Sequence, residues 1–150
     1  MRVFLIVGAI LCLTTSPGLP RQAAEGTVRI GQISFDAHST SNGSVIRTRV
    51  RITNHGRDST QVLVSAGCEV ATQVYRQVAG IPAWDDRKRI CFAMEKRVVL
   101  LPNKPVEFEH TDSIARIRGD SLAPGTYRLA AVVNVVGARL EIPTGSAVLR

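Results

Sequence analysis

Residues 122–136, with the sequence LAPGTYRLAAVVNVV, form the longest apolar run after the N-terminus, and they open on Pro124-Gly125, a strong turn signal. Proline fixes φ and glycine tolerates positive φ, so the pair favours a reversal of the backbone. The residues that follow are rich in valine, as buried strands are. We expect a turn that leads into a central strand, with the Tyr127 hydroxyl bonded back across the corner.

Residues 45–53 (VIRTRVRIT) show the clearest alternation in the chain. Side chains in a strand point alternately to its two faces, so one face of this strand belongs to the core and the other to water. The inward positions are Ile46, Thr48, Val50 and Ile52, and the outward ones are Arg47, Arg49 and Arg51.

Other runs are less regular. In residues 27–35 the apolar side chains shift from even positions to odd positions after Gly31. A bulge near Gly31 in one strand would explain this shift. Residues 59–65 are expected to return antiparallel to 45–53, and 69–78 fit a strand better than a helix because valines recur there. The stretch 114–122 is either irregular or a short strand. Further strands are predicted at 94–102, 106–110, 139–142 and 147–149.

About eight or nine short runs separated by turn signals, without a long amphipathic helix, predict an all-β fold. We expect an immunoglobulin-like antiparallel β-sandwich occupying residues 25–150 as one domain, with a barrel as the competing architecture.

The N-terminal segment 1–24 has the pattern of a secretory signal peptide. One basic residue, Arg2, precedes an apolar run that is too short to span a bilayer, and small and turn-forming residues follow it. We expect a secreted or periplasmic protein with no membrane span after cleavage; an uncleaved anchor or a buried N-terminal strand is the alternative.

Loss of the signal peptide removes Cys12 and leaves two of the three cysteines, Cys68 and Cys91. An even pair in an oxidising compartment predicts a disulfide, although two buried free thiols are possible. A zinc site needs more ligands than these two distant thiols, and no histidine lies at ligand spacing from either one.

Motifs for catalysis are missing from the sequence. It contains no nucleophile elbow, zinc-protease motif or phosphate-binding glycine loop. His38 and His55 fall in expected turns and His110 at an expected strand end. Asp85-Asp86 is either a carboxylate pair or cation ligand or, as the better explanation, forms local charge pairs with the basic residues that follow. We therefore expect a protein that is not an enzyme and has no catalytic residue, cofactor or metal.

The chain is basic, with a net charge of +7 that becomes +5 when Arg2 and Arg21 leave with the signal peptide. Such a surplus favours solubility or an acidic partner, such as an envelope component. The row Arg47, Arg49 and Arg51 is either a solvated strand face or a binding stripe for phosphates or carboxylates. No aromatic residue is interleaved with it, so nucleic acid is not expected as a partner.

The connection 79–91 is the second candidate for binding. Its tryptophan, Trp84, is the only one in the chain and either plugs the sandwich edge or belongs to a loop directed at a protease. Arg87, Lys88 and Arg89 supply charge, and a disulfide at Cys91 would pre-organise the loop.

Four motifs together resemble the BsuPI-type proteinase-inhibitor domains. They are Thr53-Asn54 after an alternating strand, the segment 80–84, the pair of runs 98–102 and 106–108, and the corner 122–129. The likeness covers residues 45–136. It implies a small all-β domain that inhibits serine proteases, and it assigns no inhibitory residue to this chain.

Together these features predict a secreted or periplasmic, non-catalytic β-sandwich that binds a protein partner, with a protease contacted through 79–91 as the first candidate. The alternative is an envelope-associated binding or assembly module of immunoglobulin type.

Overall fold

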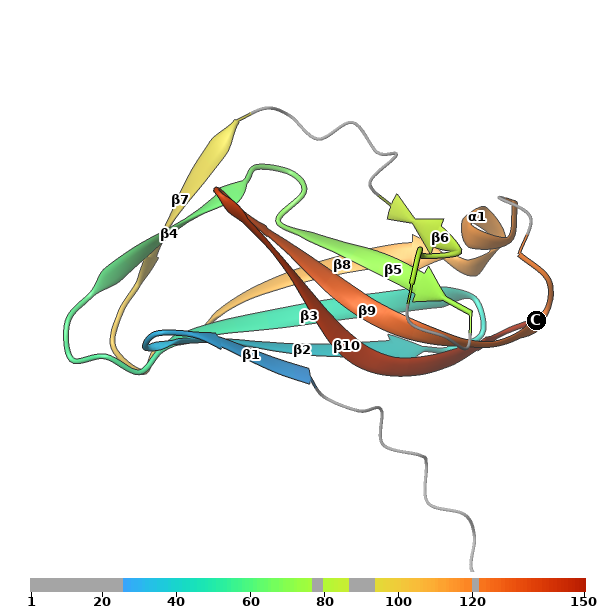
Figure 1. Cartoon of the computed structure of the whole chain (residues 1–150), viewed down its shortest axis with the longest axis horizontal. Coiled ribbons are helices and arrows are strands. Elements are labelled where there is room, and N and C mark those ends of the chain that lie inside the picture. The colour runs from blue at the N-terminus through green and yellow to red at the C-terminus, as the bar shows by residue number, and fades with distance from the viewer. Residues whose placement is uncertain (1–25, 77–79, 87–93, 120–121) are drawn as a thin grey trace, which may run out of the picture.

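The computed structural model describes residues 26–76, 80–86, 94–119 and 122–150. These residues form two antiparallel β-sheets packed face to face, which confirms the immunoglobulin-like β-sandwich (Figure 1). The strands are β1 (Gly26–Ile30), β2 (Ile33–Ser41), β3 (Val45–Asn54), β4 (Thr60–Ser65), β5 (Val70–Tyr75), β6 (Trp84–Asp85), β7 (Glu95–Leu100), β8 (Val106–Ser113), β9 (Gly125–Val135) and β10 (Ala138–Leu149), with one helix, α1 (Ile114–Gly119). The expected signal peptide, 1–24, lies outside the described residues.

One sheet has the order β1-β2-β3-β8, and the six-stranded sheet has the order β6-β5-β9-β4-β7 with β10 also paired to β9. The central place of β9 confirms the expectation for residues 122–136. The corner before it is confirmed as well, because the Tyr127 hydroxyl donates a 2.7 Å hydrogen bond to the carbonyl of Ala123. Among the described residues, no helix is long and apolar enough to cross a membrane.

The expectation of one bulged strand at 27–35 is wrong. Two strands, β1 and β2, pair as a hairpin around the two-residue turn at Gly31 and Gln32. Gly31 has a φ of +58°, which glycine adopts without steric cost. The change of parity in the sequence therefore marks a reversal of the chain.

The strand at 60–65 was expected beside 45–53, and this is wrong as well, because β4 lies in the other sheet and pairs with β7. The passage of the chain from β3 in one sheet to β4 in the other is stabilised by Asn54, which is buried at the end of β3. Its amide group donates to the carbonyls of Asp58 and Leu100, and its side-chain oxygen accepts the N–H of Gly56. A single side chain thus satisfies three backbone polar groups, two in the loop between the sheets and one at the end of β7.

Two further segments differ from expectation. Residues 114–119 form α1, because Ile114 and Ile117 lie three residues apart and bury on one helix face, and the Ser113 hydroxyl accepts the N–H of Arg116 as an N-cap. The runs 139–142 and 147–149 belong to one strand, β10, whose register shifts between Pro143 and Gly145.

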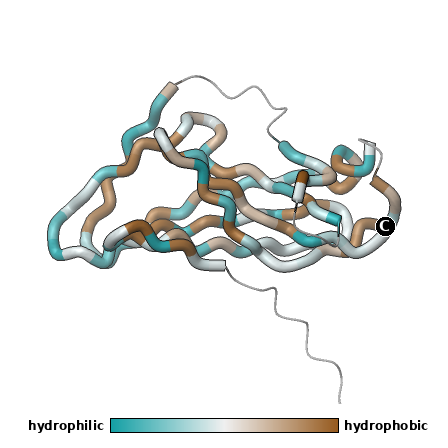
Figure 2. The backbone as a smooth tube through the Cα atoms, in the orientation of Figure 1, coloured by the Kyte–Doolittle hydropathy of each residue, from teal (hydrophilic) through white to brown (hydrophobic). Residues whose placement is uncertain are grey.

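The interior contains two apolar clusters, one on either side of a polar layer. The alternation of β3 is as expected, with Val50 and Ile52 in the first cluster, Ile46 in the second and Thr48 between them. Hydrophobic and hydrophilic positions alternate along the strands in Figure 2. The polar layer leads to the side of the sandwich where β8, β6 and α1 meet.

Candidate functional site

Four hydroxyl groups form a hydrogen-bonded chain across the sandwich. Thr144 of β10 bonds Ser39 of β2 at 2.7 Å, Ser39 bonds Thr48 of β3 at 2.9 Å, and Thr48 bonds Thr72 of β5 at 2.9 Å. All four residues are buried. Buried hydroxyls are stable only when paired, so this chain fixes the register of four strands at once.

Beyond Thr72 the polar layer continues into a cluster of charged and titratable side chains, which we call the 86–116 cluster: Asp86, His110, Asp112 and Arg116. His110 and Asp112 lie two residues apart in β8 and therefore share its inward face. Asp86 directly follows β6, and Arg116 lies on α1. The His110 Nε2 atom lies 2.8 Å from Asp86 Oδ2 and 3.1 Å from Asp112 Oδ1. One guanidinium nitrogen of Arg116 contacts Oδ1 of both aspartates.

Burial makes these ion pairs stronger than surface ones. The side chains of Asp86 and Asp112 are 4% and 0% exposed, whereas that of Arg116 is 47% exposed. Burial alone would raise the pKa of Asp112, but the hydrogen bond and charge of His110, with Thr72 and Arg116 in support, hold that pKa below its usual value. Burial would lower the pKa of Arg116, and the two carboxylates raise it. Asp112 therefore stays ionised at neutral pH.

Trp84 contacts the same cluster through Arg116. Its indole is 5% exposed, and the Arg116 guanidinium carbon lies 5.3 Å from the ring centroid in a cation–π contact. Of the two interpretations of Trp84, the structure supports the plug at the sandwich edge.

The segment 83–86 is fixed residue by residue. The Ala83 N–H donates to the Val74 carbonyl at 2.8 Å, and Trp84 and Asp85 pair with β5. The Gln73 amide donates to Asp85 at 3.0 Å, and Asp86 enters the 86–116 cluster. By contrast, Ile81 just before it is 95% exposed. An apolar side chain thus projects into water from a rigid base.

The expected arginine row exists, but its charge is largely balanced. Arg47 and Arg49 pair with Glu109 at 3.2 and 2.8 Å, and Arg51 pairs with Glu107 at 2.8 Å. The carboxylates come from β8, which lies beside β3 in the sheet. The row is a ladder of exposed cross-strand ion pairs, which favours the solvated interpretation.

The other predicted site residues lie elsewhere. Arg87, Lys88, Arg89 and Cys91 fall outside the described residues, so the disulfide with Cys68 stays a prediction. Cys68 itself is buried after β4.

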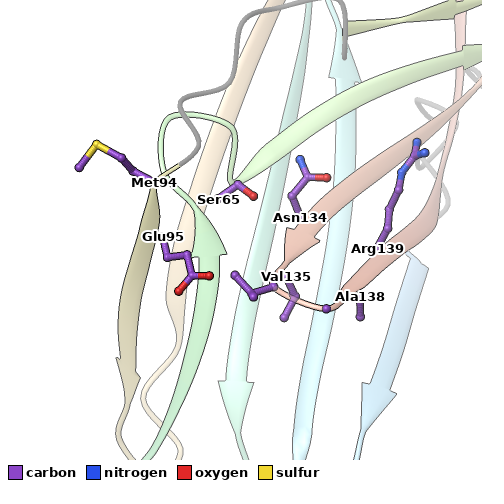
Figure 3. A pocket seen from close by; sticks show the side chains of 9 residues that line it. Ser65, Met94, Glu95, Asn134, Val135, Ala138 and Arg139 are labelled. Carbon is purple, nitrogen blue, oxygen red and sulfur yellow. The ribbon is translucent and has the colours of Figure 1, made fainter.

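An open groove of about 550 Å³ separates the start of β7 from the β9–β10 hairpin (Figure 3). Met94 and Glu95 line one side, and Val135, Ala138 and Arg139 line the other. None of the residues predicted to bind a partner lines it.

The sequence did not indicate the 86–116 cluster. His110 was expected at a strand end and His38 in a turn, but both lie within strands, β8 and β2. The one available signal was the spacing His110-x-Asp112, which puts both side chains on one face of a strand. Asp86 is remote in sequence and reaches them only because β6 pairs with β5.

No family model matches the chain, and no curated protein has a matching sequence. Among solved structures, it is similar to β-glucosidase 3B from Thermotoga neapolitana in complex with glucose, with 12% identity, a TM-score of 0.38 and coverage of 77% of this chain but only 16% of that one. A β-glucosidase from Listeria innocua has 15% identity, a TM-score of 0.36 and the same coverages. The putative ApaA protein from Bordetella pertussis has 18% identity and a TM-score of 0.29, covering 85% of this chain and 94% of that one. Similarities of this size say nothing about activity.

Proposed function

We propose that this protein is a non-catalytic, exported binding module whose partner is a protein, with a serine protease as the first partner to test. The observation that carries the proposal is the contrast between Ile81 at 95% exposure and Trp84 at 5%. The contact residues would be Ile81 and Pro82, at the described part of the loop predicted for binding.

Pre-organisation is the physical reason. A loop that is already held in its bound shape loses less conformational entropy on association. Backbone pairing with β5 and the ion pairs of Asp86 hold the segment 83–86, and Pro82 restricts its own φ. A projecting apolar side chain on such a base fits a concave site, such as the specificity pocket of a protease that accepts apolar residues.

The experiment is a titration of purified protein into subtilisin-like and trypsin-like proteases with residual activity as the readout. We expect inhibition of a subtilisin-like enzyme at micromolar concentration, weakened about tenfold or more by Ile81→Asp, a loss of roughly 1.4 kcal/mol. Met94→Asp is the matched control, because Met94 is also an exposed apolar residue but lies at the groove. Absence of inhibition by the wild type, or equal losses in both variants, would reject the proposal.

The alternative, an envelope-associated module that binds acidic material through Arg47, Arg49 and Arg51, has less support. Glu107 and Glu109 already pair with these arginines, so an anionic partner would have to compete with them. Pull-down from envelope extracts separates the two functions, because Arg47→Glu with Arg49→Glu would abolish capture only in the alternative.

A further inference from the structure

Three side chains of the 86–116 cluster place potential metal ligands together. One ligand atom each from Asp86, His110 and Asp112 lies within 4.8 Å of the others. The contacts of 2.8 and 3.1 Å between the imidazole nitrogen and the two carboxylates are close to the separations between ligands that share one small cation. This arrangement is independent of Ile81 and of any partner that the loop binds.

The cluster also contains an unsatisfied ligand atom. Asp112 Oδ2 is buried and has no hydrogen-bond partner among the described residues, although the other oxygen, Oδ1, contacts both His110 and Arg116. Buried carboxylate oxygens are normally paired, and those that are not call for an explanation such as an ion. A metal-ligating imidazole must be neutral, and in that state two carboxylates and one guanidinium give the cluster a net charge of −1, which favours a cation.

We propose that Asp86, His110 and Asp112 bind one divalent transition-metal ion, for which Zn²⁺ is the probe, and that Arg116 supplies the positive charge when the ion is absent. The inference goes beyond the proposed binding function and does not depend on it.

The donor set selects the class of metal. One imidazole nitrogen with two carboxylates suits Zn²⁺, whereas Ca²⁺ and Mg²⁺ prefer oxygen ligands alone. Three protein ligands leave a fourth position open for water or a partner's side chain. The His110 Nε2 atom must offer its lone pair to the metal, so the neutral ring would carry its proton on Nδ1.

Arg116 is able to give way because its side chain is half exposed. The guanidinium lies over Trp84 at the surface of α1, and it can move into water when a metal ion takes over the carboxylates. Trp84 is the only tryptophan of the chain, so its emission reports this movement directly.

The test is a Zn²⁺ titration of tag-free protein, previously treated with chelator, followed by calorimetry and by Trp84 fluorescence. We expect one ion per chain, a change in emission, and binding that Ca²⁺ does not reproduce. His110→Gln is expected to weaken binding by about tenfold or more. His55→Gln is the matched control, because His55 lies outside the cluster and bonds Ser34 instead.

Arg116→Gln gives the sharpest outcome. Removing the competing positive charge is expected to tighten Zn²⁺ binding about tenfold. A purely structural ion-pair cluster predicts the opposite, a less stable protein that binds no metal. Asp86→Asn replaces His110→Gln if circular dichroism shows that the histidine variant is unfolded. The proposal is overturned if the wild type binds no Zn²⁺, if the folded ligand variant binds as well as the wild type, or if Arg116→Gln does not bind more tightly.

Discussion

Arg116→Gln is also expected to destabilise the metal-free protein substantially. The substitution removes the guanidinium that contacts the carboxylates of both Asp86 and Asp112, which are nearly inaccessible to water. Removing one partner of a fully buried ion pair costs about 3–5 kcal/mol. Since Arg116 is half exposed, water screens part of the interaction, and we expect a loss of about 2 kcal/mol, including the contact with Trp84.

Urea denaturation followed by circular dichroism measures this loss. A loss of about 2 kcal/mol lowers the midpoint by about 1 M when the slope is about 2 kcal/mol per M. Chelator in the buffer prevents a bound cation from replacing the guanidinium. Arg118→Gln is the matched control, because Arg118 lies on the same helix and bonds only the exposed carbonyl of Arg150 among the described contacts; its expected cost is below about 0.5 kcal/mol.

The pH dependence gives an independent check. The pKa of Asp112 is lowered in the folded protein, so its contribution to stability is present above the pKa of the unfolded chain and is lost as the pH falls through the folded value. The difference in stability between Arg116→Gln and the wild type should therefore shrink as the pH falls below about 4, the ordinary pKa of an aspartate in an unfolded chain. A variant that matches Arg118→Gln at pH 7, or a difference that does not shrink as the pH falls below about 4, would refute the role of the guanidinium as the counter-charge of the carboxylates.

The remaining predictions concern the fold. Tyr127→Phe removes the hydrogen bond across the corner and is expected to cost about 1 kcal/mol in urea denaturation, whereas an unchanged midpoint would contradict a structural corner. Thr48→Val leaves two buried hydroxyls each short of a partner and is expected to cost about 1–2 kcal/mol; a neutral result would mean that the hydroxyl chain is dispensable. Burial and the hydrogen bond to Glu141 raise the pKa of Tyr75, so stability that is full below about pH 10 should fall as the pH rises further, and Tyr75→Phe should lack this alkaline loss. Reduction of the predicted disulfide of Cys68 should cost about 3 kcal/mol, and an equal midpoint with and without reductant would argue for free thiols.

Local patterns in the sequence predicted the parts of the fold that depend on neighbours in the chain. The alternation at 45–53 became β3, and the corner before Tyr127 formed as expected, because strand periodicity and turn chemistry act over a few residues. The sheet assignment of β4 was missed because it depends on Asn54 bonding the carbonyl of Leu100, 46 residues away.

The candidate site was harder to predict for the same reason. Thr48 and Thr72 looked like ordinary inward positions of two strands, and only the packing of the sheets joins their hydroxyls. His110 and Asp112 were close in sequence, but neither indicates a site without Asp86, which reaches them across the second sheet. A site whose residues come from two sheets has no contiguous motif in the sequence.

The central claim is that the 86–116 cluster holds the segment from which Ile81 projects. Amide hydrogen–deuterium exchange over residues 83–86, in the wild type and in Arg116→Gln, tests it most directly. We predict that the Ala83 amide, bonded to Val74, is protected in the wild type and loses at least about tenfold of its protection in the variant, corresponding to about 1.4 kcal/mol of local stability. Equal exchange rates in the two proteins would show that β6 is held without the cluster and would contradict the claim.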